Sequence, residues 1–503
     1  MKLNDLLDGF ITFSNSNLEG VVDKTITGLA LNSQAVVSGN VFIALAGSKQ
    51  HGLSYIDQAV AKGAIAVIFD PAGGGKQMAE QLNYLPLIEV DNLNLKLGEI
   101  ASRYYGNPSR FITVIGITGT NGKTSCSQFL SQMIEECGII GTLGWGECDK
   151  LNKTFNTTPD ALENQRILAE LLTNKKKVVA MEVSSHGLVQ NRVDGVIFKG
   201  AVFTNISQDH LDYHGTMEAY LQAKLTLLNK PGLTFVVVNL DDVYSDQIIE
   251  AIPEGVAIWG ISTQGKTKAA YECVNAENIL HTVNGIEFDI RWQNATEHIK
   301  IPIFGDFNSE NILAVLAVML AMGISMPDAI NKLQLVKPIK GRMERFGGDD
   351  GNPLIFVDYA HTPDALNKVL ASLRKHCLQN LWLVFGCGGN RDKGKRSQMG
   401  RIAEHWADHI IVTDDNPRFE NSLHIVKDIL SGFSASNDGT YKASVEVIQN
   451  RALAIQNAIA RASDSDCIVV AGKGHESYQE INGVQLELSD AQVVIDALKM
   501  RAG

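Results

Sequence analysis

Short apolar runs recur along the chain, and polar turns or longer amphipathic stretches separate them. Eight such runs precede residue 262, and they lie at 40–47, 64–70, 85–90, 111–118, 176–183, 200–206, 233–239 and 256–261. Helical patterns separate the later ones. Continuous apolar runs of this length, alternating with helices, are typical of strands in a parallel sheet that is covered on both faces.

Strand-like runs also follow residue 337, and they alternate with helical patterns in the same way. The runs lie at 353–359, 381–389, 409–415 and 467–474. Apolar positions at helical spacing fall between them, at 362–376 and 450–462. In a doubly wound sheet, ligands bind beyond the carboxyl ends of the strands. The polar residues that follow these strands are therefore predicted to share one crevice.

The pattern predicts an α/β protein of three domains. A smaller α/β domain covers 1–98, a central domain with a parallel sheet covers 99–336, and a C-terminal Rossmann-like domain with a doubly wound sheet covers 337–503. The stretch YYGNPSR marks the first boundary and KPIKGRMERFG marks the second.

Composition narrows the function classes. The 44 basic and 56 acidic residues give a net charge of −12, which argues against a protein that mainly grips nucleic acid or an anionic membrane. The 7 cysteines include no C-x-x-C pair, which disfavours a disulfide framework or a zinc site and favours a reducing cytosol. No run reaches the roughly 18 apolar residues of a membrane span, so we expect a cytoplasmic protein.

The stretch GITGTNGKTS joins the run at 111–118 to a predicted helix that begins near Lys123. Gly119 and Gly122 allow a tight turn whose N–H groups face phosphate oxygens, Lys123 can reach the β- and γ-phosphates, and Thr124 can place its hydroxyl on Mg²⁺. The strict motif has glycine where this chain has Ile117. The alternative is a plain strand–turn–helix, but the strand, the glycines, lysine and threonine favour a phosphate loop.

Two further segments place polar side chains after apolar runs. Glu182 ends the run at 176–183, where it can hold Mg²⁺ or lie as a surface acid. Asp209, His210, Asp212 and His214 cluster after the run at 200–206 and predict a polar site. Lys224 has apolar neighbours in a predicted helix, and by pattern alone it reads as a solvated lysine.

Ten motifs occur in one order along nearly the whole chain: GTNGKT, EVSSHGL, DHLDYHG, YLQAKL, GDFNSENILA, GRMERF, VDYAHTPDAL, GCGGNRDKGKR, DDNPR and GKGHE. This series resembles the Mur ligases, the ATP-dependent amide-forming enzymes of peptidoglycan precursor synthesis, and among them the diaminopimelate-adding members. The resemblance implies that the three domains bind UDP, ATP and the amino acid in that order. It also implies transfer of the ATP γ-phosphate to the D-glutamate carboxylate of UDP-N-acetylmuramoyl-L-alanyl-D-glutamate, followed by attack of the meso-diaminopimelate amine on the acyl phosphate.

The resemblance assigns roles around ATP and Mg²⁺. The phosphate-loop contacts are Gly119, Thr120, Asn121, Gly122, Lys123, Thr124 and Ser125. Asn308 and Asn311 resemble adenine contacts, with helix capping as their alternative, and Arg342 and Asp358 resemble further nucleotide contacts. The implied metal residues are Thr124, Glu182, His210 and Lys224, the last as a carbamate. Lys123, His210 and Lys224 are implied to be catalytic, as is Lys393, which reaches the γ-phosphate when the domains close.

The resemblance also assigns contacts to the nucleotide-sugar dipeptide. In the first domain these are Leu31, Ser33, Ser48, Lys49 and Gln50, while Asn32 and His51 stand where many relatives carry Asp. In the central domain they are Asn156, Thr157, Thr158, Ser184, Gln190 and Arg192. Arg192 supplies a fork for a carboxylate or phosphate.

The stretch TDDNPRFE follows the strand-like run at 409–415, and Asp415 and Arg418 could simply pair with each other. By position in the predicted crevice they lie beside Arg391 and the AGKGHE loop instead. Asp415 and Glu476 can accept from an ammonium, Asn416 can orient the amino-acid group, and Arg391 and Arg418 can each hold a carboxylate. The resemblance agrees, adds Gly472 as a contact, and marks Arg418 as selecting diaminopimelate over lysine, which lacks the second carboxylate.

Several alternatives stay open at this point. Within the class they are a lysine-adding relative and a ligase of the folylpolyglutamate or D-alanyl-D-alanine-adding type. A different class is a phosphate-loop NTPase that switches without forming amides, and a binding-only homologue is a further one. The implied partners are small molecules, with no nucleic acid and no membrane insertion, and the expected oligomeric state is a monomer.

Overall fold

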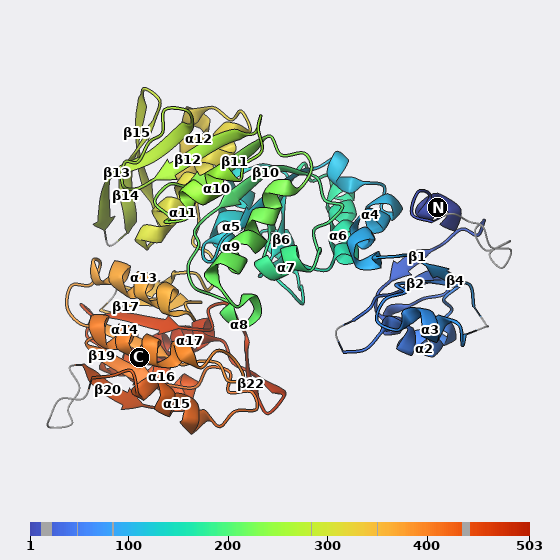
Figure 1. Ribbon diagram of the computed structural model, residues 1–503. Helices are drawn as coiled ribbons and strands as arrows, with labels where there is room; N and C mark the ends of the chain where they lie inside the picture. Colours follow the sequence, from blue (N-terminus) through green and yellow to red (C-terminus); the bar gives the residue numbers. More distant parts are fainter. Residues whose placement is uncertain are drawn as a thin grey trace.

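The computed structural model describes residues 1–11, 23–47, 49–82, 85–282, 284–349, 351–434 and 443–502. Three α/β units follow one another along the chain (Figure 1). The N-terminal unit lies at one side of the central unit, and the C-terminal unit lies below it, next to helices of the central unit. The predicted three-domain α/β architecture is therefore confirmed.

The N-terminal sheet is parallel and has the order β1-β2-β3-β4. Its strands are β1 (Gly28–Ala30), β2 (Asn40–Ala44), β3 (Ala66–Phe69) and β4 (Leu87–Glu89). Its helices are α1 (Leu3–Leu7), α2 (Ile56–Ala61), α3 (Gly75–Ala79) and α4 (Leu93–Tyr104). Alternate strand residues pack against α1 and α4 on one face and against α2 and α3 on the other. The sequence pattern missed β1, which has only 3 residues.

Helix α4 connects the first unit to the second. The boundary predicted after residue 98 falls inside this helix, which packs on α6 (Ala161–Thr173) of the central unit. Ala161 and Leu162 join the apolar core of the N-terminal unit. A Cβ at Gly98 would lie 1.9 Å from the carbonyl oxygen of Asp194, so this glycine permits a close backbone contact. The second predicted boundary, after residue 336, falls between α12 and β16.

The central sheet has the order β15-β14-β13-β12-β11-β10-β5-β9-β6-β7-β8. Its strands are β5 (Thr113–Thr118), β6 (Cys137–Gly141), β7 (Gly144–Glu147), β8 (Lys150–Asn152), β9 (Val178–Glu182), β10 (Phe198–Phe203), β11 (Phe235–Asn239), β12 (Ala257–Ser262), β13 (Glu272–Thr282), β14 (Gly285–Trp292) and β15 (Ala295–Ile301). The predicted parallel sheet holds from β13 to β6, but both edges are antiparallel. The edge strands have exposed faces and tight connections, which antiparallel hairpins tolerate and parallel strands do not.

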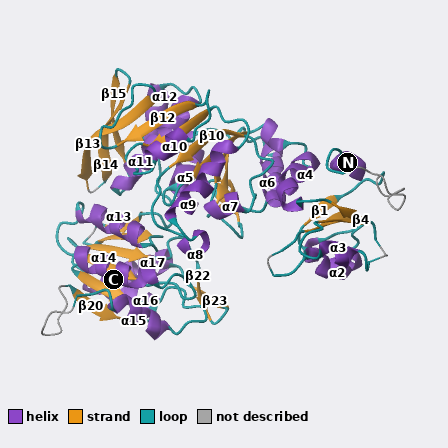
Figure 2. Ribbon diagram, in the orientation of Figure 1, coloured by secondary structure: helices purple, strands orange, loops and turns teal. Residues whose placement is uncertain are grey.

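Helices cover both faces of the central sheet (Figure 2). One face packs against α5 (Lys123–Met133), α11 (Asp306–Ala321) and α12 (Met326–Leu333). The other packs against α6, α9 (Met217–Leu225) and α10 (Ser245–Glu250). Two short helices, α7 (Ser185–Val189) and α8 (Leu211–His214), follow the carboxyl ends of β9 and β10. The predicted site residues of this domain therefore lie at the carboxyl ends of its parallel strands, while helices cover both faces of the sheet.

The C-terminal sheet has the order β16-β17-β21-β18-β19-β20, and all its pairs except β16–β17 are parallel. Its strands are β16 (Glu344–Gly347), β17 (Leu354–Asp358), β18 (Leu381–Phe385), β19 (His409–Val412), β20 (Ser444–Val447) and β21 (Cys467–Ala471). One face carries α13 (Pro363–Arg374), α14 (Gly394–Trp406) and α15 (Ser422–Leu430), and the other carries α16 (Arg451–Arg461) and α17 (Asp490–Ala502). A separate hairpin consists of β22 (Tyr478–Ile481) and β23 (Val484–Glu487).

Strand β21 lies between β17 and β18 and is parallel to both, as β18 is to β19. The carboxyl ends of all the predicted C-terminal strands therefore lie at the same end of the sheet. This is the crevice that the sequence pattern predicted. Within the described residues, no helix is both long enough and apolar enough to cross a membrane.

Candidate active site

A cavity of about 260 Å³ lies between the central and C-terminal domains. The central domain lines it with the turn Thr120–Ser125 and with His210 and Asn311. The C-terminal domain contributes Arg342 and Asp358. Most of the predicted nucleotide contacts thus border one space, although they come from two domains.

The turn between β5 and α5 has the shape of a phosphate loop. Gly119 and Gly122 have φ values of 145° and 87°, which other residues rarely adopt. A Cβ at Gly119 would lie 1.9 Å from Oγ1 of Thr204, and one at Gly122 would lie 2.4 Å from Oδ1 of Asn311. The ammonium of Lys123 donates to the carbonyl oxygens of Gly119 and Thr120, at 2.8 Å each. Burial lowers the pKa of Lys123, and the carboxylates of Glu182 and Asp209 oppose that shift.

Glu182 ends β9 directly beside the phosphate loop and is fully buried. Its carboxylate accepts hydrogen bonds from Oγ1 of Thr124 at 3.0 Å, from Oγ of Ser127 at 3.2 Å, and from the backbone and hydroxyl of Thr142 at 3.1 and 2.9 Å. Among the described residues, no three His, Cys, Asp or Glu side chains form a group that could hold a metal ion by themselves. Mg²⁺ commonly takes one or two protein ligands and completes its shell with phosphate oxygens and water, so Glu182 with Thr124 fits that donor set.

Lys224 is not the solvated lysine that its sequence pattern suggested. The residue is 1% exposed, and its ammonium donates to the carbonyl oxygen of Gly119 at 2.9 Å. Its nitrogen lies 4.5 Å from the centroid of the Tyr220 ring. Burial, together with the charge of Lys123, lowers the pKa of Lys224 well below its usual value. Two lysines, the partly exposed Lys123 and the buried Lys224, therefore donate to the same glycine of the phosphate loop.

His210 borders the nucleotide cavity from the start of α8. Its φ of 55° is left-handed, which turns the chain sharply after β10. The imidazole Nε2 lies 3.4 Å from Oδ2 of Asp209, and its ring packs edge-on against His186 with centroids 4.8 Å apart. Burial lowers the pKa of His210, although Asp209 counteracts it.

The predicted adenine and ribose contacts lie where α11 and β17 meet the cavity. Helix capping does not explain Asn308 or Asn311, because Gly305 is the N-cap of α11. Asn311 borders the cavity and donates through Nδ2 to Oδ1 of Asn308 at 2.9 Å. The carboxylate of Asp358 accepts from the amides of Met343 and Ala360, at 2.8 and 2.7 Å. Burial raises the pKa of Asp358.

Two polar links cross the domain interface at this cavity. Nη2 of Arg342 donates to Oγ1 of Thr124 at 3.3 Å, and its guanidinium lies over the Tyr359 ring at 4.3 Å from the centroid. Asp364, in the first turn of α13, accepts from Nδ2 of Asn121 and from Oγ of Ser207, at 3.0 Å each. The sequence analysis missed Asp364, since an acid in the first turn of a helix has an ordinary local role there.

The predicted dipeptide contacts of the central domain form a connected group behind the phosphate loop. Oγ1 of Thr158 donates to the carbonyl oxygen of Glu182 at 3.0 Å and accepts from the amide of Ser184 at 2.9 Å. Arg192 donates to the carbonyl oxygen of Thr158 at 2.9 Å and to Oε1 of Gln190 at 2.6 Å. The hydroxyls of Thr157 and Thr142 lie 3.1 Å apart, which connects this group to Glu182.

The predicted uridine contacts lie in the N-terminal domain. Ser33 is buried and donates to Oε1 of Gln58 at 2.7 Å, and Leu31 packs against the domain core. Gln50 accepts from the hydroxyl of Tyr55 at 3.2 Å, and Lys49 is exposed. Ser48 lies outside the described residues. His51 is buried and bonds to the backbone of Asp70 and Leu53, so it supports the loop from within.

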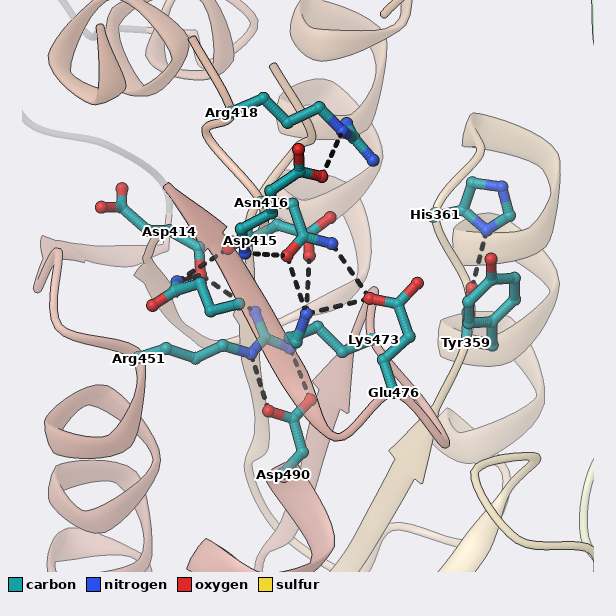
Figure 3. A network of polar contacts seen from close by, with 12 residues as sticks. Tyr359, His361, Asp414, Asp415, Asn416, Arg418, Arg451, Lys473, Glu476 and Asp490 are labelled. Carbon is teal, nitrogen blue, oxygen red and sulfur yellow. Dashed lines mark hydrogen bonds and ion pairs between the residues drawn. The ribbon is translucent and has the colours of Figure 1, made fainter. Parts of the chain in front are cut away.

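The predicted amino-acid contacts after β19 and β21 lie close together, around a lysine that the sequence analysis missed (Figure 3). The ammonium of Lys473 lies 2.9 Å from Oε2 of Glu476, 3.1 Å from Oδ1 of Asn416 and 3.7 Å from Oδ1 of Asp415. Nδ2 of Asn416 donates to Oε2 of Glu476 at 3.0 Å. Gly472 has a φ of 117°, and a Cβ there would lie 3.9 Å from the Asp415 carboxylate.

Arg418 does not pair with Asp415. Its Nε donates to Oε2 of Glu480 at 3.2 Å, and one terminal nitrogen donates to the carbonyl oxygen of Gly389 at 2.8 Å. Its φ of 53° and the paired backbone of β22 hold this loop against the hairpin. Arg391 is exposed on the neighbouring loop, where its Cγ would lie 3.8 Å from a Cβ at Gly388. Both arginines thus lie on loops next to the amino-acid cluster, which consists of Asp415, Asn416, Lys473 and Glu476.

Lys393 lies away from the nucleotide cavity. Its side chain is 70% exposed at the start of α14, and its ammonium lies 3.4 Å from Oε1 of Glu420. Lys395 lies closer to the nucleotide cavity than Lys393 does. Its ammonium donates to the carbonyl oxygen of His361, and His361 lines that cavity. In this conformation the structure does not bring Lys393 to the phosphate loop.

A wide cleft of about 1490 Å³ runs between the central and C-terminal domains. Asn156 and Thr157 line it from the central domain, and Glu476 and Tyr478 line it from the C-terminal domain. Two of the predicted dipeptide contacts, Asn156 and Thr157, and one predicted amino-acid contact, Glu476, therefore line one space, which reaches the nucleotide cavity at Thr157 and Tyr359.

Comparison with known proteins agrees with this arrangement. Family models match as "Mur ligase family, catalytic domain" over 25–105, "Mur ligase middle domain" over 117–319 and "Mur ligase, glutamate ligase domain" over 341–474. The UDP-N-acetylmuramoyl-L-alanyl-D-glutamate–2,6-diaminopimelate ligase of Alkalilimnicola ehrlichii is 41% identical over 512 residues, with 100% of both chains covered. The enzyme of that name from Xylella fastidiosa strain Temecula1 is 43% identical over 481 residues, covering 95% of this chain and 94% of its own. A solved structure of a ligase of that name superimposes with a TM-score of 0.70 at 32% identity, covering 100% of this chain and 99% of its own.

Proposed function

This chain belongs to the Mur ligase family, and we propose that within it the chain is the ligase that adds meso-diaminopimelate to UDP-N-acetylmuramoyl-L-alanyl-D-glutamate. ATP drives the reaction, which serves peptidoglycan precursor synthesis. The observation that carries the proposal is the wide cleft, where Asn156 and Thr157 lie on one side and Glu476 on the other, next to the phosphate loop. The names of the full-length relatives support the same substrates.

Different residues would serve the phosphoryl transfer, the attack of the amine and the metal ion. The phosphate loop and Lys123 hold the ATP phosphates while the γ-phosphoryl group passes to the D-glutamate carboxylate. The resulting acyl phosphate faces the wide cleft, from which the diaminopimelate amine attacks its carbonyl carbon. The tetrahedral intermediate then expels phosphate and leaves the amide. When bound, Mg²⁺ would neutralise the two reacting anions, with Glu182 and Thr124 as its nearest protein donors.

The buried Lys224 fits a carbamate better than an ammonium. A lowered pKa increases the fraction of neutral amine, which is the form that reacts with carbon dioxide. The carbamate turns the same side chain into a carboxylate beside the phosphate loop. A carboxylate ligates Mg²⁺, whereas an ammonium repels it. Lys224 therefore serves as a metal-site residue together with His210.

Arg418 and Arg391 provide the selectivity for diaminopimelate. The side chain of Arg418 is held by Glu480 and by the carbonyl oxygen of Gly389, and Arg391 is exposed on the neighbouring loop. The two guanidiniums would match the two carboxylates of diaminopimelate. Lysine lacks the second carboxylate and would leave one arginine without a ligand partner.

The test is phosphate release from ATP, measured with and without each substrate. We expect turnover only when the sugar dipeptide and meso-diaminopimelate are both present. Substantial release without them would indicate an NTPase switch. A panel of meso-diaminopimelate, L,L-diaminopimelate and lysine separates a diaminopimelate ligase from a lysine-adding one, and preference for lysine would contradict the proposal.

A further inference from the structure

Lys473 occupies the centre of the amino-acid cluster and has no solvent-exposed surface. Figure 3 shows its ammonium between Asp415, Asn416 and Glu476, which come from the loop after β19 and from the turn after β21. Burying a lysine ammonium away from water is energetically unfavourable unless charged and polar partners surround it. The site therefore carries a built-in cation before any substrate ammonium arrives.

The contacts of Lys473 fix the orientation of one amide. Oδ1 of Asn416 accepts from the Lys473 ammonium at 3.1 Å and from the amide of Glu480 at 2.9 Å. Because both partners are donors, this atom must be the oxygen, and the amide nitrogen must face Glu476. That nitrogen has two hydrogens, and one donates to Glu476 at 3.0 Å. Among the described residues, no acceptor is recorded for the second hydrogen of this nitrogen.

The charges around Lys473 leave room for one more cation. Lys473 and Arg451 face the carboxylates of Asp415, Glu476 and Asp490. Arg451 and Asp490 pair with each other at 2.7 Å, and neither side chain is exposed. The remaining group thus has one cation and two carboxylates. Oδ1 of Asp415 is buried and makes no hydrogen bond, although it lies near the Lys473 ammonium.

We propose that Lys473 is a positioning residue for the amino-acid substrate, an inference that rests on the function proposed above. Its ammonium orients Asn416 as a donor toward the substrate carboxylate, and it holds Asp415 and Glu476 apart so that they receive one substrate ammonium. Lys473 acts through these three residues and takes no part in the transfer of the phosphoryl group. Its removal should weaken amino-acid use and spare ATP use.

The experiment compares Lys473→Met, Lys473→Arg and the control Lys499→Met, whose lysine is 72% exposed on α17. Initial phosphate release is measured against meso-diaminopimelate and, separately, against ATP. For Lys473→Met we expect the KM for diaminopimelate to rise about tenfold or more, and the KM for ATP to stay within about twofold. Lys473→Arg should recover part of the loss, because it keeps the charge and the donors. Lys499→Met should match the wild type.

Thermal unfolding of each variant shows whether a change is merely structural. If Lys473→Met does not fold, Lys473→Gln replaces it, since glutamine removes the charge but keeps an amide donor for Asn416. An unchanged KM for diaminopimelate in the folded variant, or an equal rise in both KM values, would overturn the inference. A wild-type protein that releases no diaminopimelate-dependent phosphate would instead overturn the proposed function, so the two failures are distinguishable.

Discussion

The nucleotide cavity and the amino-acid cluster are built in opposite ways. Two domains share the cavity, and the links Arg342–Thr124 and Asp364–Asn121 cross from one to the other. The cluster lies within the C-terminal domain alone, where Lys473 faces two carboxylates and the neighbouring Arg451 and Asp490 pair with each other. A site between domains depends on how the domains meet, whereas a site within one domain is preorganised. We therefore expect mutations to affect the use of ATP and of the amino acid separately.

The largest expected effect concerns the stability of the cluster. Arg451→Met leaves Asp490 as a buried charge without its partner, which should destabilise the fold by about 3–5 kcal/mol. The shift is measured as a lower urea midpoint in the absence of substrates. The double variant Arg451→Met/Asp490→Leu removes both charges and should recover most of the stability. A single variant as stable as the wild type would show that the pair contributes little.

The next effect should separate chemistry from amino-acid binding. Lys224→Ala should lower turnover roughly 10²–10³-fold, because it removes the residue that we propose for the metal site, beside the phosphate loop. Added bicarbonate should restore part of the activity, because this oxyanion can occupy the space that the carbamate would leave. Diaminopimelate binding, followed by calorimetry, should stay within about twofold, since the cluster lies in another domain. Full turnover in the variant would contradict the assigned role.

A smaller effect is expected next to the cluster, and it should change amino-acid use while sparing the chemical step. Arg418→Ala should raise the KM for diaminopimelate roughly tenfold to a hundredfold, because a carboxylate loses its charged donor. The KM for ATP should hardly change. Arg401→Ala, on the exposed side of α14, is the matched control. Equal losses for both substrates would mean that Arg418 mainly holds the hairpin through Glu480.

The smallest effect tests the interface itself. Asp364→Ala removes two hydrogen bonds between the domains and should raise the KM for ATP about two- to tenfold. The KM for diaminopimelate should remain near the wild-type value. The effect is read from initial rates at saturating dipeptide, and a rise for diaminopimelate alone would show that the two sites are not separable in this way.

The same contrast explains how much the sequence could predict. The phosphate loop is contiguous, so its strand, glycines, lysine and threonine were all recognisable before the fold was known. The residues Asp415, Asn416 and Glu476 were recognisable because they follow predicted strands of one sheet. Lys473 was not, since a lysine between two glycines reads as a loop residue until the fold buries it. Asp364 was missed because its partners are supplied by another domain.

Burial also changed the interpretation of Lys224, whose environment depends on the position of α9 beside the phosphate loop. The antiparallel edges of the central sheet were missed for a related reason. Their strands have alternating exposure and lack the long apolar runs that identified the parallel strands. Patterns along the chain thus predicted the centres of the sheets better than their edges.

Helix α4 has a consequence for substrate selection. Its packing on α6 joins the apolar core of the N-terminal domain to the central domain, which connects the domain of the predicted uridine contacts to the domain of the phosphate loop. Under the function proposed above, a substrate held at its uridine end by the N-terminal domain would then have to span a set distance to the phosphate loop. Only a precursor whose peptide already ends at D-glutamate would bring its carboxylate level with the γ-phosphate. A shorter precursor would bind at one end and fall short at the other, so α4 would help to set the order in which residues are added.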